Sequence, residues 1–292
     1  MADLSFTASF SARRVLVCVA AAAVFLGGCA GRPEAPVVRP VSDSVSASIA
    51  ARLDPLLPTD VLLLGEQHDA AAHQQLEQEV IALLAARGML AAVALEMANT
   101  GATTAALKPS STEQQVQSAL RWNNKGWPWA AYGPAVMTAV RAGVPVLGAN
   151  LPDDQMQSSM TNSKLDVQLP GPALKAQQQL IRIGHCNLLP ESRISPMTRI
   201  QIAKDISMAD ALGKTVLPGK VVVLLSGSAH ADRSLGVPQH LREGISSKSV
   251  LMRAGDATPD LPGRADAFNS VWVTSALPAT DYCEKFKAET GR

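Results

Sequence analysis

The 292-residue chain lacks most of the short motifs that identify an enzyme class. It has no Gly-x-x-x-x-Gly-Lys-Ser/Thr loop and no Gly-x-Gly-x-x-Gly after a strand pattern, so the usual nucleotide-binding fingerprints are missing. It also lacks a Gly-x-Ser-x-Gly elbow and a Cys-x-x-Cys-His site for covalent haem attachment. The formal net charge is only +1, which gives no basic surface for nucleic acid. These absences argue against nucleotide enzymes, serine hydrolases of that type, c-type cytochromes and nucleic-acid-binding proteins.

Cysteine is scarce, and two of the four cysteines, Cys18 and Cys29, lie in an amino-terminal targeting pattern. Arg13 and Arg14 precede an apolar run, 15–25, that is too short to span a bilayer and ends in Leu-Gly-Gly-Cys29. This is typical of a bacterial secretory signal, and its ending resembles the lipobox of lipoproteins. We therefore expect a signal peptide over 1–28 and a lipidated Cys29, followed by a Pro-rich tether to residue 58. An ordinary signal cut elsewhere is the alternative.

The resemblance to lipoproteins also suggests a location. Ala30 follows the cysteine where inner-membrane lipoproteins have Asp, which implies a lipid anchor in the outer membrane with the protein on the periplasmic side. Cys18 leaves with the signal, so Cys186 and Cys283 are the thiols that remain in the folded part. The periplasm is oxidising, and we expect these two to form a disulfide.

Repeated strand-then-helix patterns predict an α/β domain over 59–280, with 281–292 as a tail. A buried parallel strand is apolar on both faces, so it reads as a continuous apolar run. The predicted strands are 61–65, 91–97, 144–149, 220–226, 249–253 and 270–274. Strands separated by helices favour a parallel sheet with flanking helices. A stretch without strand signals, about 153–219, predicts a smaller helical subdomain.

Polar residues follow four of these strands. They are Glu66 and His68, then Glu96, then Asn150, and finally Ser228 and His230. Because parallel strands place their carboxyl ends on one edge, we expect these side chains to converge. Glu66, His68, Glu96 and His230 suit general acid–base catalysis. Glu66, His68 and His230 would also suit a zinc or iron site. Any one of these residues could instead be an ordinary hydrogen-bonded side chain, but this alternative is weaker for all four together, because each falls at a strand end.

A second candidate set is aromatic. Trp122, Trp127, Trp129 and Tyr132 fall within eleven positions, whereas the whole chain is only 4% aromatic. The segment is interrupted by Gly126 and Pro128, which is unusual for a simple core helix. Its rings could line a flat apolar pocket, and Tyr132 could supply a phenolate ligand to iron. The alternative is a lid whose rings only pack against the core.

Several short segments, in order, resemble the ChaN-like haem-binding lipoproteins of the superfamily that includes Tiki proteins and erythromycin esterases. The matching segments are Gly65-Glu66-Gln67-His68-Asp69 with His73, Leu95-Glu96-Met97, Trp127-x-Trp129-x-x-Tyr132-Gly133-Pro134, Ala149-Asn150-Leu151-Pro152, His185-Cys186, Gln201-x-x-x-Asp205-x-x-Met208-Ala209, Ser226-Gly227-Ser228-Ala229-His230 and Gly236-Val237-Pro238. They run from about 60 to 241.

The resemblance implies non-covalent haem binding at the surface of a homodimer, with a role in haem or iron uptake. For the haem ligand it suggests tyrosine and histidine, which makes Tyr132 the first choice and His68, His73 and His230 the next, with Trp129 beside the haem. Within the wider superfamily, Glu66, His68, Glu96 and His230 match positions proposed for hydrolysis or metal binding. A metal-assisted or acid–base hydrolase is therefore the alternative function, with a divalent metal as the alternative cofactor.

Overall fold

The computed structural model describes residues 43–255 and 264–290. The predicted signal peptide, Cys29 and residues 30–42 of the predicted tether lie outside the described residues, whereas residues 43–58 are described. None of the helices in the described ranges is long and apolar enough to cross a membrane.

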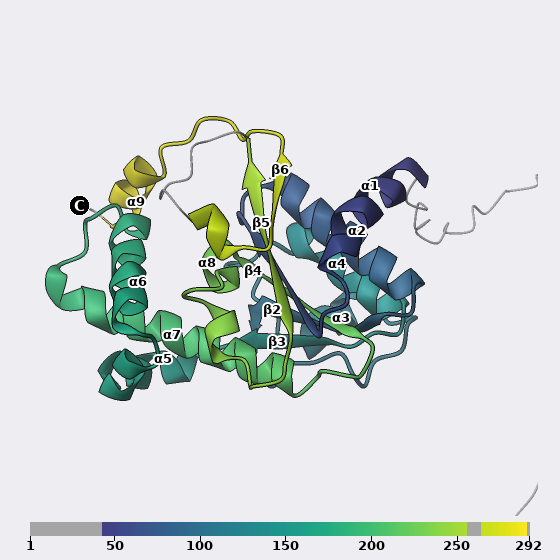
Figure 1. Ribbon diagram of the computed structural model, residues 1–292, viewed down its shortest axis with the longest axis horizontal. Coiled ribbons are helices and arrows are strands. Elements are labelled where there is room, and N and C mark those ends of the chain that lie inside the picture. The colour runs from purple at the N-terminus through teal and green to yellow at the C-terminus, as the bar shows by residue number, and fades with distance from the viewer. Residues whose placement is uncertain (1–42, 256–263, 291–292) are drawn as a thin grey trace, which may run out of the picture. The chain divides into compact units, whose positions relative to one another are not determined.

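The described residues form a six-stranded sheet in the order β3-β2-β4-β1-β5-β6, and every strand pair is parallel (Figure 1). This confirms the predicted fold class. The strands are β1 (Val61–Glu66), β2 (Leu90–Asn99), β3 (Val146–Asn150), β4 (Val221–Gly227), β5 (Ser247–Ala254) and β6 (Ser270–Thr274). All six predicted strands are present, with ends that differ from the predictions by up to two residues.

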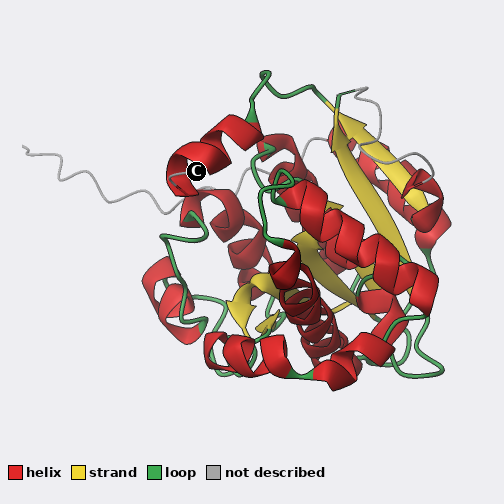
Figure 2. Ribbon diagram, turned by 90° about the vertical axis from the view of Figure 1, so that its left-hand side faces the viewer, coloured by secondary structure: helices red, strands yellow, loops and turns green. Residues whose placement is uncertain are grey.

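Helices cover both faces of the sheet (Figure 2). In chain order they are α1 (Asp43–Leu53), α2 (Ala71–Ala86), α3 (Glu113–Ala119), α4 (Trp129–Arg141), α5 (Asp153–Thr161), α6 (Gly171–Gly184), α7 (Glu191–Gly213), α8 (Ser228–Ala231) and α9 (Tyr282–Thr290). Short 3-10 turns are η1 (Asp54–Leu56), η2 (Ser163–Val167), η3 (Val237–His240) and η4 (Arg264–Ala267).

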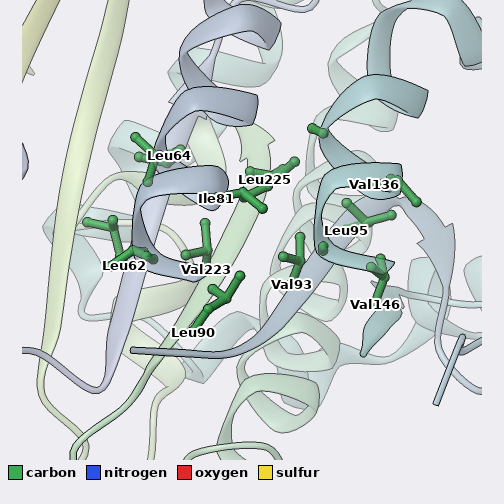
Figure 3. Packing of buried hydrophobic residues seen from close by; sticks show 14 of the residues in the cluster. Leu62, Leu64, Ile81, Leu90, Val93, Leu95, Val136, Val146, Val223 and Leu225 are labelled. Atoms are coloured by element: carbon green, nitrogen blue, oxygen red, sulfur yellow. The ribbon is translucent and has the colours of Figure 1, made fainter. Parts of the chain in front are cut away.

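Alternate residues of each central strand point into two separate apolar clusters, which explains the continuous apolar runs in the sequence. Leu62 and Leu64 of β1 belong to the cluster under α2 and α4 (Figure 3). Val61 and Leu63 belong to the cluster on the other face, where they meet Met208 and other residues of α7. All four β1 side chains are fully buried. Burying such a side chain stabilises the fold by roughly 1.5–3 kcal/mol, so the central strands are rigid supports for the polar residues at their carboxyl ends.

The segment between β3 and β4 is helical, comprising α5, η2, α6 and α7. It has a small apolar cluster of its own that includes Leu165, Leu169 and Ile202. Helix α7 also packs along the sheet, so its first half belongs to this helical segment and its second half to the sheet layer. The predicted carboxyl-terminal tail contains α9, which lies beside α6 in Figure 1.

Candidate functional site

Three neighbouring strands bring the predicted acidic and imidazole residues together. In the sheet order β2-β4-β1, Glu96 lies on β2, Glu66 ends β1, and β4 leads through Gly227 into α8 with His230. Glu66 and Gly227 are direct register partners across β1 and β4. Glu66 and Gly227, which are 161 positions apart in the sequence, thus meet at one edge, because parallel strands end on the same side of a sheet.

Glu66 is a buried carboxylate that accepts three side-chain hydrogen bonds. Its Oε1 accepts from the Tyr132 hydroxyl at 2.7 Å and from His68 Nδ1–H at 2.8 Å. Its Oε2 accepts from Gln74 Nε2 at 2.6 Å. The same Gln74 amide also donates to the His68 carbonyl at 3.2 Å. A buried carboxylate needs such donors to offset its lost hydration, and here they also fix the ring of His68.

His68 is the exposed member of the site. Its side chain is 41% exposed, whereas those of Glu66 and Glu96 are almost fully buried. With Nδ1–H donated to Glu66, the lone pair of the neutral ring is on Nε2, which lies 4.0 Å from Glu96 Oε2. Burial opposes protonation of His68, but the Glu66 hydrogen bond and the Glu96 charge outweigh burial and raise its pKa. The site therefore contains one partly exposed imidazole whose ring is held in a fixed orientation by Glu66.

The lack of a side chain at Gly227 makes room for the His68 ring. A Cβ at this position would lie 2.9 Å from His68 Nε2 and 3.6 Å from Glu96 Oε2. The backbone N–H of Gly227 also donates to Glu96 Oε2 at 2.7 Å. A side chain here would displace the His68 ring, so the glycine is required by this close approach.

Behind His68 lies a buried ion triad of Glu96, His230 and Asp205. His230 Nδ1 is 2.5 Å from Asp205 Oδ1, and Nε2 is 3.3 Å from Glu96 Oε1. Burial alone would lower the pKa of His230, but the two carboxylates raise it to about 10. Burial raises the pKa of Asp205 to about 6. At neutral pH the triad is therefore an imidazolium between two carboxylates, and it holds Glu96 as an anion.

Asp205 and Gln201 were not among the predicted site residues. They lie one turn apart on α7, which places them on one face of the helix. The Gln201 amide is 3.1 Å from His230 Nδ1, and Asp205 is fully buried. The i, i+4 pairing of an amide and an acid within an otherwise apolar helix face is the sequence signal that could have indicated them.

The four predicted aromatic residues form one cluster that reaches the site. Trp127 lies edge-on to His68, with 4.9 Å between ring centroids, and 5.9 Å from Tyr132. Trp122 contacts both Trp129 and Tyr132, and the tryptophans also pack on the core under α4. The cluster therefore fills a corner of the core and also supplies an aromatic wall for His68.

Tyr132 itself is inaccessible in this arrangement. Its side chain is 1% exposed, and its hydroxyl donates to Glu66. Burial, followed by the Glu66 charge and hydrogen bond, raises the pKa of this phenol far above its usual value. Formation of a phenolate ligand here would require breaking that bond and exposing the ring.

His73 and Asn150 lie outside the cluster of acids and imidazoles. His73 is fully buried, with Nδ1 accepting from Gln67 N–H at 3.0 Å and Nε2 3.0 Å from Thr274 Oγ1. It therefore anchors the loop that carries His68. Asn150 Oδ1 accepts from the neighbouring Leu151 N–H. Trp129, another predicted cofactor contact, donates Nε1–H to Glu113 at 2.8 Å.

Glu77 is a further buried acid, absent from the sequence-based candidates. It lies on α2 one turn after Gln74, is fully buried, and has no hydrogen-bond partner for either carboxylate oxygen in the described part of the chain. Burial, and then the Glu66 charge, raise its pKa well above the usual value. Burial therefore favours the neutral form of Glu77.

Comparison with known proteins identifies the family. The family model described as "Haem-binding uptake, Tiki superfamily, ChaN" matches residues 53–241, which include every member of the site. The chain belongs to this family. A solved structure described as cofacial heme binding to ChaN of Campylobacter jejuni matches with 26% identity and a TM-score of 0.60, covering 73% of this chain and 87% of that one.

A second solved structure, that of the type III effector HopBA1, matches with 15% identity and a TM-score of 0.39, covering 75% of this chain and 88% of that one. No curated protein matches the chain. The ChaN family and the α/β fold predicted from the sequence are therefore confirmed.

The geometry fits haem better than a protein-held metal ion. Within residues 43–255 and 264–290, no group of three or more His, Cys, Asp or Glu is arranged to hold a metal ion. A haem iron needs only one or two axial donors from the protein, because the porphyrin supplies the other four. The hydrogen bond from His68 Nδ1–H to Glu66 is the carboxylate–histidine pairing that orients metal-binding imidazoles.

Proposed function

We propose that this chain binds haem non-covalently, with His68 Nε2 as the axial donor to the iron, in haem or iron uptake. The observation that carries this proposal is the state of His68. Its side chain is exposed and its ring is oriented by Glu66, while its Nε2 lies 4.0 Å from Glu96 Oε2, beyond hydrogen-bond distance. Of the other imidazoles considered as haem ligands, His73 and His230 are buried and engaged through both ring nitrogens.

Haem bound at His68 would supply the iron chemistry, while the chain's own residues hold and orient it. The Trp127 ring beside His68 gives an apolar contact of the kind that a porphyrin face requires. Glu66 fixes the tautomer and increases the basicity of His68. Glu96, held as an anion by His230, places negative charge 4.0 Å from His68 Nε2, and this charge would stabilise a positively charged group bound there.

Titration of haemin into the full-length protein in detergent tests the proposal. The parent should develop the absorbance spectrum of bound haem with saturable stoichiometry, and His68→Ala should lose it. His240→Gln is the matched control, because His240 lies in η3 and is not part of the site. Absence of a spectral change with the parent, or an unchanged spectrum with His68→Ala, would reject the assignment.

We also propose that the chain is an outer-membrane lipoprotein anchored through Cys29 and facing the periplasm. The support is the signal and lipobox pattern together with Ala30. Cys29→Ser should abolish partitioning into a detergent phase and retain the unprocessed signal. Partitioning equal to that of the parent would contradict the lipid anchor.

A homodimer is proposed from the relative that binds haem cofacially, since two stacked haems need a site on each of two copies. Sedimentation of the protein with and without haemin tests this. The dimer should form, or become tighter, when haemin is added, and a monomer at saturating haemin would exclude it.

An acid–base hydrolase is the second candidate, and one specific observation favours it. A carboxylate that accepts Nδ1–H from a partly exposed histidine is also the arrangement of an oriented general base. In this reading His68 activates water, while Glu96 and His230 hold charge next to it. Ester and peptide substrates should be hydrolysed by the parent and not by His68→Ala. Equal rates in both proteins would exclude this function.

A further inference from the structure

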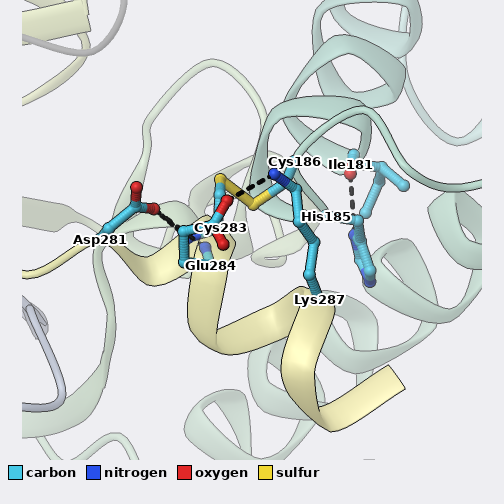
Figure 4. Close-up of a disulfide and its surroundings, with 7 residues drawn as sticks. All are labelled: Ile181, His185, Cys186, Asp281, Cys283, Glu284 and Lys287. Atoms are coloured by element: carbon cyan, nitrogen blue, oxygen red, sulfur yellow. Dashed lines mark hydrogen bonds and ion pairs between the residues drawn. A yellow bond between two sulfur atoms is a disulfide. The ribbon is translucent and has the colours of Figure 1, made fainter. Parts of the chain in front are cut away.

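Helix α9, outside the 53–241 range of the family match, is fixed at its first turn by several side chains. Asp281 Oδ1 accepts from the backbone N–H of Cys283 and Glu284, both at 2.9 Å, and so caps the helix. Cys283 forms a disulfide with Cys186 in the turn between α6 and α7 (Figure 4). Phe286 lies edge-on to His185 of the same turn, at 5.8 Å between centroids. The helix is therefore attached to the helical segment by a covalent bond and an aromatic contact.

Tyr282, the residue before Cys283, contacts the loop that carries His68. The Tyr282 hydroxyl donates to Asp69 Oδ2 at 2.6 Å, although the two residues are 213 positions apart. Asp69 directly follows His68 in the loop between β1 and α2. Two adjacent residues of α9 thus join the His68 loop on one side to the α6–α7 turn on the other.

On its buried side, the His68 loop is hydrogen-bonded to residues of α2. His73 accepts from Gln67 N–H, and Gln74 donates to the His68 carbonyl. The outer side is solvent-exposed at Gln67, His68 and Asp69, and there Tyr282 supplies the long-range contact. A loop that is ordered before binding loses less conformational freedom when a ligand binds. The Tyr282–Asp69 contact is therefore placed to affect affinity at His68 without touching the ligand.

We propose that α9 is a redox-dependent strap: the Cys186–Cys283 disulfide holds Tyr282 against Asp69 and thereby keeps the loop that presents His68 in its binding geometry. Tyr282 is a positioning residue in this scheme. The effect on haem rests on the proposed function, while the effect on the loop does not. Opening the disulfide is predicted to loosen the loop and to weaken the binding of ferric haem.

The redox step is an ordinary thiol–disulfide exchange with a dithiol reductant. One thiolate attacks a sulfur of the Cys186–Cys283 bond, the second thiol of the reductant resolves the mixed disulfide, and two protein thiols and one oxidised reductant result. Both cysteines are half-buried rather than enclosed in the core, so a reductant can reach them. The tie that is lost spans 97 residues of the chain, and Tyr282 then depends on its own hydrogen bonds to the His68 loop, with Asp69 and Gln67.

The test compares variants of the full-length protein rather than adding a reductant, because reductants also reduce haem iron. The double variant Cys186→Ser/Cys283→Ser removes the bond, Tyr282→Phe removes only the hydroxyl, and Glu284→Gln is the control on the same helix. Hydrogen exchange at Gln67 and Ala70, whose amides are bonded within the loop, measures loop order without haem. Haemin titration then measures affinity.

We expect faster exchange at these amides in the double variant and in Tyr282→Phe, and a Kd for haemin raised by about three- to tenfold in both, the effect of ordering one or two side chains on binding. Glu284→Gln should match the parent. Exchange unchanged in Tyr282→Phe overturns the strap even if the double variant is unfolded. If amide exchange becomes faster but the Kd for haemin does not change, the strap has no effect on haem binding. If the parent binds no haemin, the proposed function is rejected, and the exchange result alone still tests the strap.

Discussion

His68 donates Nδ1–H to Glu66 over 2.8 Å, and Glu66 accepts a second hydrogen bond on the same oxygen from the buried Tyr132 hydroxyl at 2.7 Å. The phenol that the sequence suggests as an iron ligand is therefore used to support the imidazole. One carboxylate connects the aromatic cluster to the exposed donor, so substitutions on either side of it have different and measurable effects.

Tyr132→Phe should destabilise the fold without removing the haem ligand. The change leaves one lone-pair direction of the buried Glu66 unsatisfied, which costs about 1–3 kcal/mol. Denaturant unfolding should show this loss, while the haemin spectrum should keep its band positions because His68 remains. A shifted or lost spectrum in a stably folded Tyr132→Phe protein would show that the phenol is the ligand.

Gly227→Ala should weaken haem binding and leave the fold intact. The added methyl group would lie 2.9 Å from His68 Nε2, and the flexible ring must rotate away, which breaks its bond to Glu66. A hydrogen bond to a charged group contributes about 1.5–3 kcal/mol, so we expect a Kd for haemin raised by about tenfold or more.

The matched control for Gly227→Ala is Gly184→Ala. Gly184 is the last residue of α6, and an added Cβ there would have no atom within 4 Å. Its haemin affinity and unfolding temperature should stay at or slightly above those of the parent. Equal affinity in both alanine variants would mean that the position of the His68 ring does not matter for binding.

The stability of the protein should fall as the pH rises from about 6.5 to 10. Glu96 and Asp205 raise the pKa of His230 to about 10 in the folded state, against about 6.5 when unfolded. The contribution of the protonated ring is therefore complete below pH 6.5 and is lost as the pH rises through the folded pKa. Each pKa unit corresponds to about 1.4 kcal/mol, so the decline amounts to several kcal/mol.

Denaturant unfolding across this range checks the decline, with His230→Gln as the comparison. The variant should be less stable than the parent by about 3–5 kcal/mol at pH 6.5, because two buried carboxylates lose their cation. The difference between the two proteins should narrow toward pH 10. A constant difference from pH 6.5 to 10 would mean that His230 is not charged in the folded protein.

Sequence reasoning found the site residues whose positions follow from the parallel direction of the strands. Glu66, Glu96 and His230 follow apolar runs, and parallel strands bring such positions to one edge. Asp205 lies in the middle of a 23-residue helix, where only the rotation of α7 against the sheet turns it toward His230. The pairing of Tyr282 with Asp69 depends on the path of the chain after β6, which no local pattern encodes. Burial of Tyr132 likewise depends on how α4 docks, so composition alone could not separate a ligand from a support.

Glu77→Gln should stabilise the protein at neutral and alkaline pH. Glu77 is fully buried with no partner for its oxygens in the described residues, and burial followed by the Glu66 charge raises its pKa. In the unfolded chain the same group ionises near pH 4.5, so folding takes up a proton above that pH and stability declines as the pH rises toward the folded pKa. Glutamine has nearly the same shape and cannot ionise, which removes this penalty.

The free energy of unfolding of Glu77→Gln should therefore exceed that of the parent at pH 8, and the two should approach each other near pH 4.5. A variant that is less stable than the parent at pH 8 would contradict this prediction. It would mean that the folded state is stabilised by the negatively charged form of Glu77.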